Sequence, residues 1–166
     1  MSYQNEITLV TPVKQGDEDI LSALLLQIKL DMEAGKKEQF ENLDIHFARW
    51  IFVNKQEVDE DFENVLSSRL IFSSIFDGVD EDHLIALSDS NVLGTFIDQM
   101  YEHCVDYPPL QERNTEKRKK YLKRWIVQPA AFYAGAPQRS VHRITKENEL
   151  RVFIRNFLNA ENWKNK

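Results

Sequence analysis

Two polar side chains interrupt an apolar segment of the chain, LDIHFARWIFVNK, which runs from Leu43 to Lys55. One of them, Arg49, carries a guanidinium, and burying that charge is costly unless an anion accompanies it. The anion can be a carboxylate of the protein, such as Asp77, or a ligand carboxylate or phosphate held by two hydrogen bonds. We therefore predict that Arg49 is either half of a structural ion pair or the main contact of a small ligand.

His46 and Asp77 could also do chemistry, and each has a plainer structural interpretation. Histidine titrates near neutral pH and can move protons, but at the start of a strand it is more often a hydrogen-bonded structural residue. Asp77 is a candidate acid, but an aspartate before Gly78 also makes a good turn ahead of an acidic helix start. The candidate catalytic residues are thus Asp77 and Arg49, and the candidate ligand-binding residues are Arg49, His46 and Ser73.

Two predicted strands, over 44–54 and 68–78, would position these residues. Side chains of a strand alternate between its two faces. We expect the more uniformly apolar face of each strand to lie against helices. This set consists of Trp50, Phe52, Leu70, Phe72 and Phe76, with His46 on the same side near the strand start. Arg49, Ser73 and Asp77 would then share the open face of the sheet. A slip of one residue in register would separate Arg49 from Asp77.

The remaining elements follow from periodicity and from residues that break it. Alternating β-branched residues predict a strand over 7–13, and apolar residues at helical spacing predict a helix over 16–37 that closes at Gly35. The acidic segment 55–68 is typical of a loop. We then expect helices over 79–89 and 91–107 that stop at Pro108-Pro109, a basic helix over 114–127, a short strand over 129–135 and a last helix from Val141 to Ala160.

This order of elements predicts one α+β domain over residues 1–166. It is the split βαβ repeat of the ferredoxin-like arrangement, an antiparallel sheet with helices on one face and additional C-terminal helices. Neither face of the sheet is depleted of apolar residues, and a large exposed apolar patch usually marks an interface or a ligand groove. We therefore expect two copies to pair face to face as a homodimer, a dimeric α/β barrel; the alternative is burial by the chain's own extra helices.

Composition narrows the classes of function. The chain has 166 residues, 42% of them hydrophobic and 29% charged, with a net charge of −6. That acidity argues against nucleic acid as a partner, and the basic residues of 117–124 are interpreted as a solvated helix face. No segment predicts a membrane span, and no motif or histidine spacing predicts a metal or nucleotide site. One cysteine, Cys104, permits no internal disulfide, so the expected location is cytoplasmic.

Four segments resemble a known group of proteins: HFARW, RLIFSSIFDG, YEHCVDYP and AAFYAG. They are similar to small bacterial ferredoxin-like proteins that sit near the dye-decolourising peroxidases in the dimeric α/β-barrel superfamily, over approximately Ile7 to Leu158. The resemblance implies the fold, the pairing of sheets and a haem-linked ancestry. It aligns Ser74–Gly78 with the G-x-x-D-G motif of those peroxidases, with serine in place of the first glycine. Asp77 would then be the distal acid of a haem site and Arg49 its partner, and no histidine is assigned as the proximal ligand.

Three functions are therefore open. The leading one is a homodimeric small-ligand-binding protein of dimeric α/β-barrel type, whose ligand contacts Arg49 with Ser73, Asp77 and His46 nearby. The second is a haem-dependent peroxidase-like enzyme in which Asp77 and Arg49 polarise bound peroxide. The third is a non-catalytic interaction module, whose apolar sheet face serves assembly alone.

Overall fold

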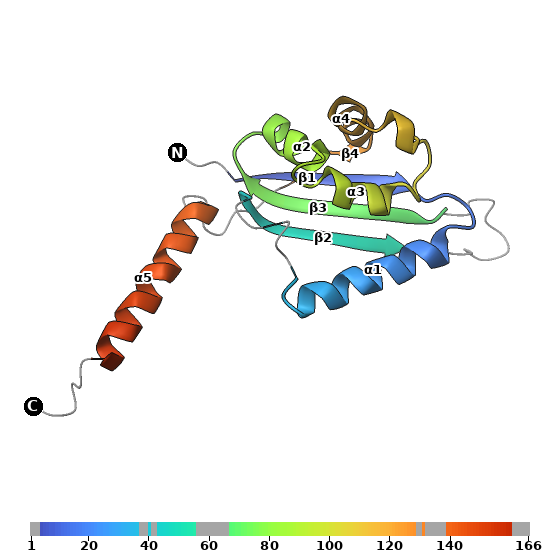
Figure 1. Cartoon of the computed structure of the whole chain (residues 1–166). Coiled ribbons are helices and arrows are strands. Elements are labelled where there is room, and N and C mark those ends of the chain that lie inside the picture. The colour runs from blue at the N-terminus through green and yellow to red at the C-terminus, as the bar shows by residue number, and fades with distance from the viewer. Residues whose placement is uncertain are drawn as a thin grey trace, which may run out of the picture.

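The protein is described here from a computed structural model, which covers residues 4–36, 40, 43–55, 67–128, 131 and 139–160 (Figure 1). Within these residues one sheet has the strand order β2-β3-β1-β4, and each neighbouring pair is antiparallel. The strands are β1 (Gln4–Pro12), β2 (Ile45–Val53), β3 (Arg69–Asp77) and β4 (Ile126–Val127). This α+β arrangement is compatible with the ferredoxin-like fold that the sequence predicts.

The described residues also form five α-helices and a short 3-10 helix. They are α1 (Glu18–Glu33), α2 (Asp80–Ser88), α3 (Gly94–Tyr101), η2 (Leu110–Glu112), α4 (Thr115–Arg124) and α5 (Val141–Ala160). The helix α1 ends where predicted, because Gly35 adopts φ +83° and its N–H donates to the carbonyl of Met32. Among these helices, none is both long and apolar enough to cross a membrane.

The core lies between the sheet and the helices α2, α3 and α4, which Figure 1 shows on the same side of it. As predicted, Leu70, Phe72 and Phe76 of β3 point into this layer and are almost fully buried. Trp50 and Phe52 of β2 point the same way but are only half-buried. The inner side of α1 is fully buried only at Leu21. The helix layer therefore closes less tightly over β2 than over β1 and β3.

The structure differs from the sequence prediction at the end of the basic helix. The predicted basic helix 114–127 ends at Arg124, and its last two residues, Ile126 and Val127, form β4 against Thr8 and Leu9. The predicted strand over 129–135 lies outside the described residues except for Ala131, which is not in a strand. The predicted loop 55–68 is likewise described only at its ends. The final helix, Val141–Ala160, has the predicted bounds.

Candidate functional site: a groove beside β2

The structure confirms that Arg49 and Ser73 share one face of the sheet, where Arg49 is exposed and Ser73 is buried. The two residues are direct partners in the β2–β3 register, and Ser73 is also paired with Thr8 of β1. A polar row therefore crosses three strands, and the hydroxyl of Thr8 donates to Ser73 Oγ at 3.4 Å. The next row on this face, towards the C-terminal end of β2, is wholly apolar and consists of Ile51, Ile71 and Val10.

The same register separates Arg49 from Asp77. Asp77 lies four residues beyond Ser73 along β3, which is about 13 Å at the rise of an extended strand. The partner of Asp77 on β1 is Gln4. The guanidinium of Arg49 instead lies 5.8 Å from the ring centroid of Phe47, and none of the described residues forms an ion pair with it. Arg49 is thus an exposed cation on an apolar strand.

His46 does not face the helices as the alternation of β2 predicted. Ile45 pairs with Phe76 and Phe47 pairs with Ile75, so His46 is the extra residue of a β-bulge. A bulge adds one unpaired residue to a strand and re-aims its side chain. As a result, Nε2 of His46 lies 3.0 Å from Oδ1 of Asp77.

Asp77 uses its second oxygen to hold the start of α5. Its Oδ2 accepts a hydrogen bond of 2.7 Å from the backbone N–H of Val141, the first residue of that helix. Gln4 adds a hydrogen bond from its side-chain amide to the carbonyl of Arg139, and the same amide nitrogen lies 3.3 Å from His46. A carboxylate at a helix N-terminus satisfies a free N–H and favours the helix dipole. We call Gln4, His46 and Asp77 the α5 anchor.

An apolar groove of about 690 Å³ lies between α1 and β2, and both His46 and Arg49 belong to its lining. Its apolar lining is Leu25, Leu26, Ile28, Met32, Phe40, Ile45, Phe47, Ala48, Trp50 and Phe52. Its polar lining is Ser22, Lys29, Glu33, His46 and Arg49. We call this cavity the α1/β2 groove. Its size and lining are those of a small-molecule site, which is usually apolar with a few polar groups.

Aromatic rings support the groove from inside the protein. The ring of Trp50 lies 4.9 Å from Phe72, 5.5 Å from Phe96 and 6.1 Å from Phe40, measured between centroids. Such tilted and edge-to-face contacts hold large side chains in place. Because Trp50 is fixed by this cluster, the β2 wall of the groove is preformed.

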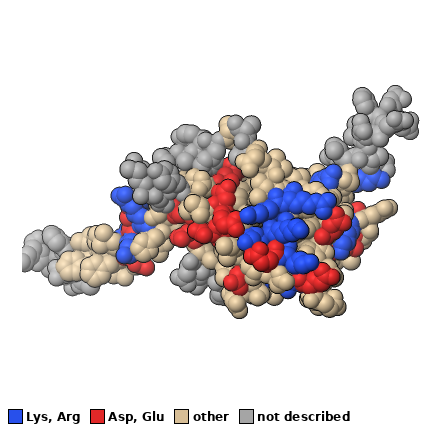
Figure 2. Space-filling model, turned by 90° about the horizontal axis from the view of Figure 1, so that it is seen from above, with Lys and Arg blue, Asp and Glu red and all other residues tan. Residues whose placement is uncertain are grey.

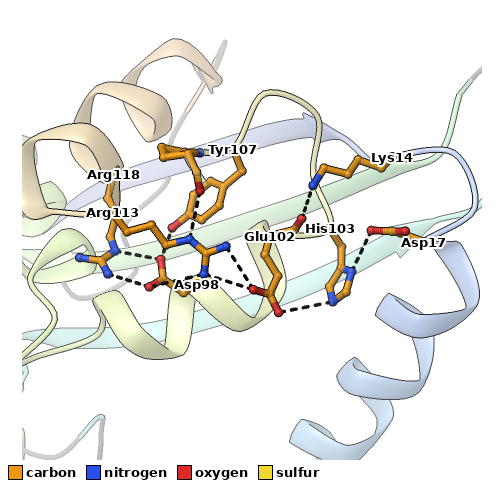
Figure 3. Close-up of polar contacts among 9 residues, drawn as sticks. Lys14, Asp17, Asp98, Glu102, His103, Tyr107, Arg113 and Arg118 are labelled. Carbon is orange, nitrogen blue, oxygen red and sulfur yellow. Dashed lines mark hydrogen bonds and ion pairs between the residues drawn. The ribbon is translucent and has the colours of Figure 1, made fainter. Parts of the chain in front are cut away.

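Sequence reasoning missed a buried polar network that joins α3 to α4 (Figure 3). Arg118 of α4 donates two hydrogen bonds to Asp98 of α3, at 2.8 and 2.6 Å, and the hydroxyl of Tyr107 donates to the same carboxylate. Burial by itself raises the pKa of Asp98, but the hydrogen bonds from Arg118 and Tyr107 outweigh it and lower that pKa. The signal was present, because Arg118 shares a helix face with Tyr121 and Leu122.

The network continues to α1 through paired residues (Figure 3). Arg113 donates to Glu102 at 3.1 Å, and His103 Nδ1 lies 3.0 Å from Asp17, just before α1. Its buried members, Asp98 and Arg118, are each satisfied by protein groups. The arrangement ties three helices together and offers no free group for chemistry.

The basic residues of α4 are matched by carboxylates rather than gathered into one cationic surface. Lys119 and Lys123 both contact Glu81, and Arg124 contacts Asp106. Figure 2 shows red atoms lying among the blue ones over this part of the surface. Tyr121 and Leu122 are buried as predicted, so the segment is the outer face of a packed helix.

Metal and thiol chemistry find no support in the described part of the chain. No three His, Cys, Asp or Glu residues lie close enough there to hold a metal ion. Cys104 is fully buried, and this burial raises the pKa of its thiol to about 11. The thiol is therefore protonated at neutral pH and is a poor nucleophile.

No family model, curated protein or solved structure matches the chain.

Proposed function

We propose that the protein binds a small amphiphilic anion in the α1/β2 groove, with Arg49 contacting the anionic group. The observation that carries this proposal is a cation without an ion-pair partner among the described residues, at the edge of an apolar groove. The groove accommodates an apolar ligand body, and the guanidinium forks onto a carboxylate or phosphate. Binding rather than catalysis is proposed, because no activated nucleophile lies among the described residues that line the groove.

The test uses two ligands with the same chain length, one with an anionic and one with a neutral head group. Decanoate and decanol would each be titrated against a fluorescent anilinonaphthalene sulfonate, a probe that brightens in apolar sites. Arg49→Ala should weaken decanoate binding about 10- to 100-fold, the range expected for a charge-assisted hydrogen bond, and leave decanol unchanged. Lys120→Ala removes an exposed cation on α4 and serves as the matched control. Equal affinity of Arg49→Ala and the wild type for decanoate would refute the proposal.

We also propose that the protein forms a homodimer through the open face of its sheet, as in dimeric α/β barrels. Support comes from the apolar row of Ile51, Ile71 and Val10, flanked by exposed Phe47 and Val53. A charge in this row should abolish pairing because it would be buried without a partner.

The variant Ile51→Glu tests this dimer by light scattering. Its matched control is Ile85→Glu on α2, since Ile51 and Ile85 are 39% and 38% exposed but lie on different surfaces. The proposal predicts a monomer for Ile51→Glu and a dimer for Ile85→Glu. Identical masses for the two variants would contradict it.

The haem-dependent alternative has less support from the geometry. Asp77 would be the distal acid, but both of its oxygens are engaged in the α5 anchor. Arg49 lies too far along the sheet to act with it. The Nε2 atom of His46, the histidine in the groove lining, already contacts Asp77 and Gln4 in the same anchor. The residues present therefore do not fit the roles that the peroxidase resemblance implies.

A further inference from the structure

The helix α5 exposes an apolar surface that the rest of the described chain does not cover. Figure 1 shows α5 extending away from the sheet and the other helices. Every side chain described from Asn148 to Asn159 is exposed. The large apolar ones are between 44% and 67% exposed: Leu150, Val152, Phe153, Ile154, Phe157 and Leu158. Contiguous apolar surface of this kind on a helix indicates a protein interface.

The apolar residues of α5 are mostly on one side. Leu150, Phe153, Ile154, Phe157 and Leu158 recur at three- and four-residue spacing, so they form a stripe along the helix. Val152 lies on the opposite side. The stripe from Leu150 to Leu158 is about 12 Å long at the rise of an α-helix.

The α5 anchor directs this stripe away from its own chain. Asp77 binds the N–H of Val141, and Gln4 binds the carbonyl of Arg139, so the first turn of α5 is fixed to the end of the sheet. With its start held there, α5 presents the stripe to a second molecule.

We propose that α5 of one copy docks in the α1/β2 groove of a second copy, and reciprocally. The groove is the complementary apolar surface on the same chain, and its α1 wall, Ser22 to Glu33, is about 16 Å long, enough for the stripe. A helix laid into an apolar groove by residues at this spacing is a common mode of recognition. Reciprocal exchange would cover both surfaces in each copy.

Each of the two surfaces carries at its border a charge that complements one on the other. On α5, Arg151 and Arg155 border the stripe on one side and Glu149 borders it on the other, as the helical spacing requires. None of these three forms an ion pair within the described residues. In the groove, Glu33 lies on the α1 wall, where it pairs with Lys29 at 3.9 Å, and Arg49 lies on the β2 wall without an ion-pair partner among the described residues. One orientation places Glu149 beside Arg49, which favours this partner over a neutral one.

This docking goes beyond the proposed ligand function and involves the same groove. If the groove also accepts an amphiphilic anion, ligand and α5 compete for it, and decanoate should convert dimers to monomers. The docking itself does not require a ligand.

Light scattering of the full chain at micromolar concentration gives the first test. The wild type should have the mass of a dimer, and Phe153→Glu on the stripe and Leu26→Glu in the groove should each halve it. Val152→Glu is the matched control on the opposite side of α5 and should stay dimeric. A monomeric wild type would overturn the proposal. So would a dimer that Ile51→Glu dissociates but Phe153→Glu does not, because the sheet face proposed above would then hold the two copies together without α5.

Crosslinking between copies gives the second test and does not depend on the stability of a charged variant. Leu26→Cys and Phe157→Cys would be purified separately, mixed and treated with a short bismaleimide; the native Cys104 is buried and does not react. The mixture should give a crosslinked dimer in larger yield than either variant alone. Equal yields would refute docking. If the mixture crosslinks but decanoate neither binds nor dissociates the dimer, docking stands and the ligand function fails.

Discussion

His83 should make the protein lose stability between neutral pH and pH 4. Its ring stacks on Phe76, with centroids 3.8 Å apart and planes 9° apart. Its Nε2 is buried without a hydrogen-bond partner among the described residues. Burial lowers the pKa of His83 from 6.5 to about 4, because the charged imidazolium is poorly solvated there.

The sign and size of the effect follow from proton linkage. An unfolded chain protonates this histidine below about 6.5, whereas the folded protein resists protonation down to about 4. The stability that the protein retains by keeping His83 neutral is therefore fully present above pH 6.5 and is lost as the pH falls towards 4. At 1.36 kcal/mol per pH unit the full loss is about 3 kcal/mol, and at pH 4.5 most of it, about 2.5 kcal/mol, has occurred.

Urea unfolding at pH 7 and pH 4.5, followed by tryptophan fluorescence, measures this loss. We expect the wild type to lose about 2.5 kcal/mol more than His83→Leu over this interval, because leucine has no proton to bind. Carboxylates contribute equally to both proteins and cancel. His142→Leu, a substitution of an exposed histidine on α5, should behave as the wild type. Equal pH dependence of the wild type and His83→Leu would show that burial of His83 does not shift its protonation.

Three further substitutions test other contacts. Arg118→Met leaves the carboxylate of Asp98 buried without its main partner and should cost about 3–5 kcal/mol in urea unfolding; a loss under 1 kcal/mol would show that the pair is solvated. Gly94→Ala places a Cβ 2.6 Å from the carbonyl oxygen of Ser88 and should cost about 1–3 kcal/mol by overpacking, so an unchanged melting temperature would refute that close approach. Asp77→Ala removes the acceptor at the start of α5 and should speed hydrogen exchange at its first turn by loss of a cap worth about 1 kcal/mol; unchanged exchange would mean that the anchor lies elsewhere.

Side-chain alternation predicted the sheet faces correctly because it depends only on the geometry of a regular strand. It placed Phe72 on the helix side and Arg49 with Ser73 on the opposite face. It failed at His46, because a bulge adds one residue to the strand. The residues of β2 before the bulge therefore face the opposite side from the one that strict alternation predicts. Nothing in HFARW distinguishes a bulged histidine from a regular one. The contact between His46 and Asp77 therefore needed the structure.

The polar network shows a different limit. A dense basic segment has the composition of a solvated face, and most of its cations do reach solvent. Arg118 is the exception, since it points inward to Asp98 on a helix twenty residues earlier. Its spacing to Tyr121 and Leu122 marked the inward side, but composition outweighed spacing in the prediction. The α1/β2 groove was also unpredictable, because it depends on how closely α1 packs on β2.

The position of β2 at the end of the strand order has a consequence for solubility. Its outer backbone groups have no neighbouring strand in the described sheet, and such a border can recruit foreign chains into fibrils. The kink at His46 and the charge of Arg49 interrupt this border at two points. Natural proteins protect their outermost strands with such irregularities and charges. The arginine that we propose as a ligand contact would thus also act as a gatekeeper against aggregation.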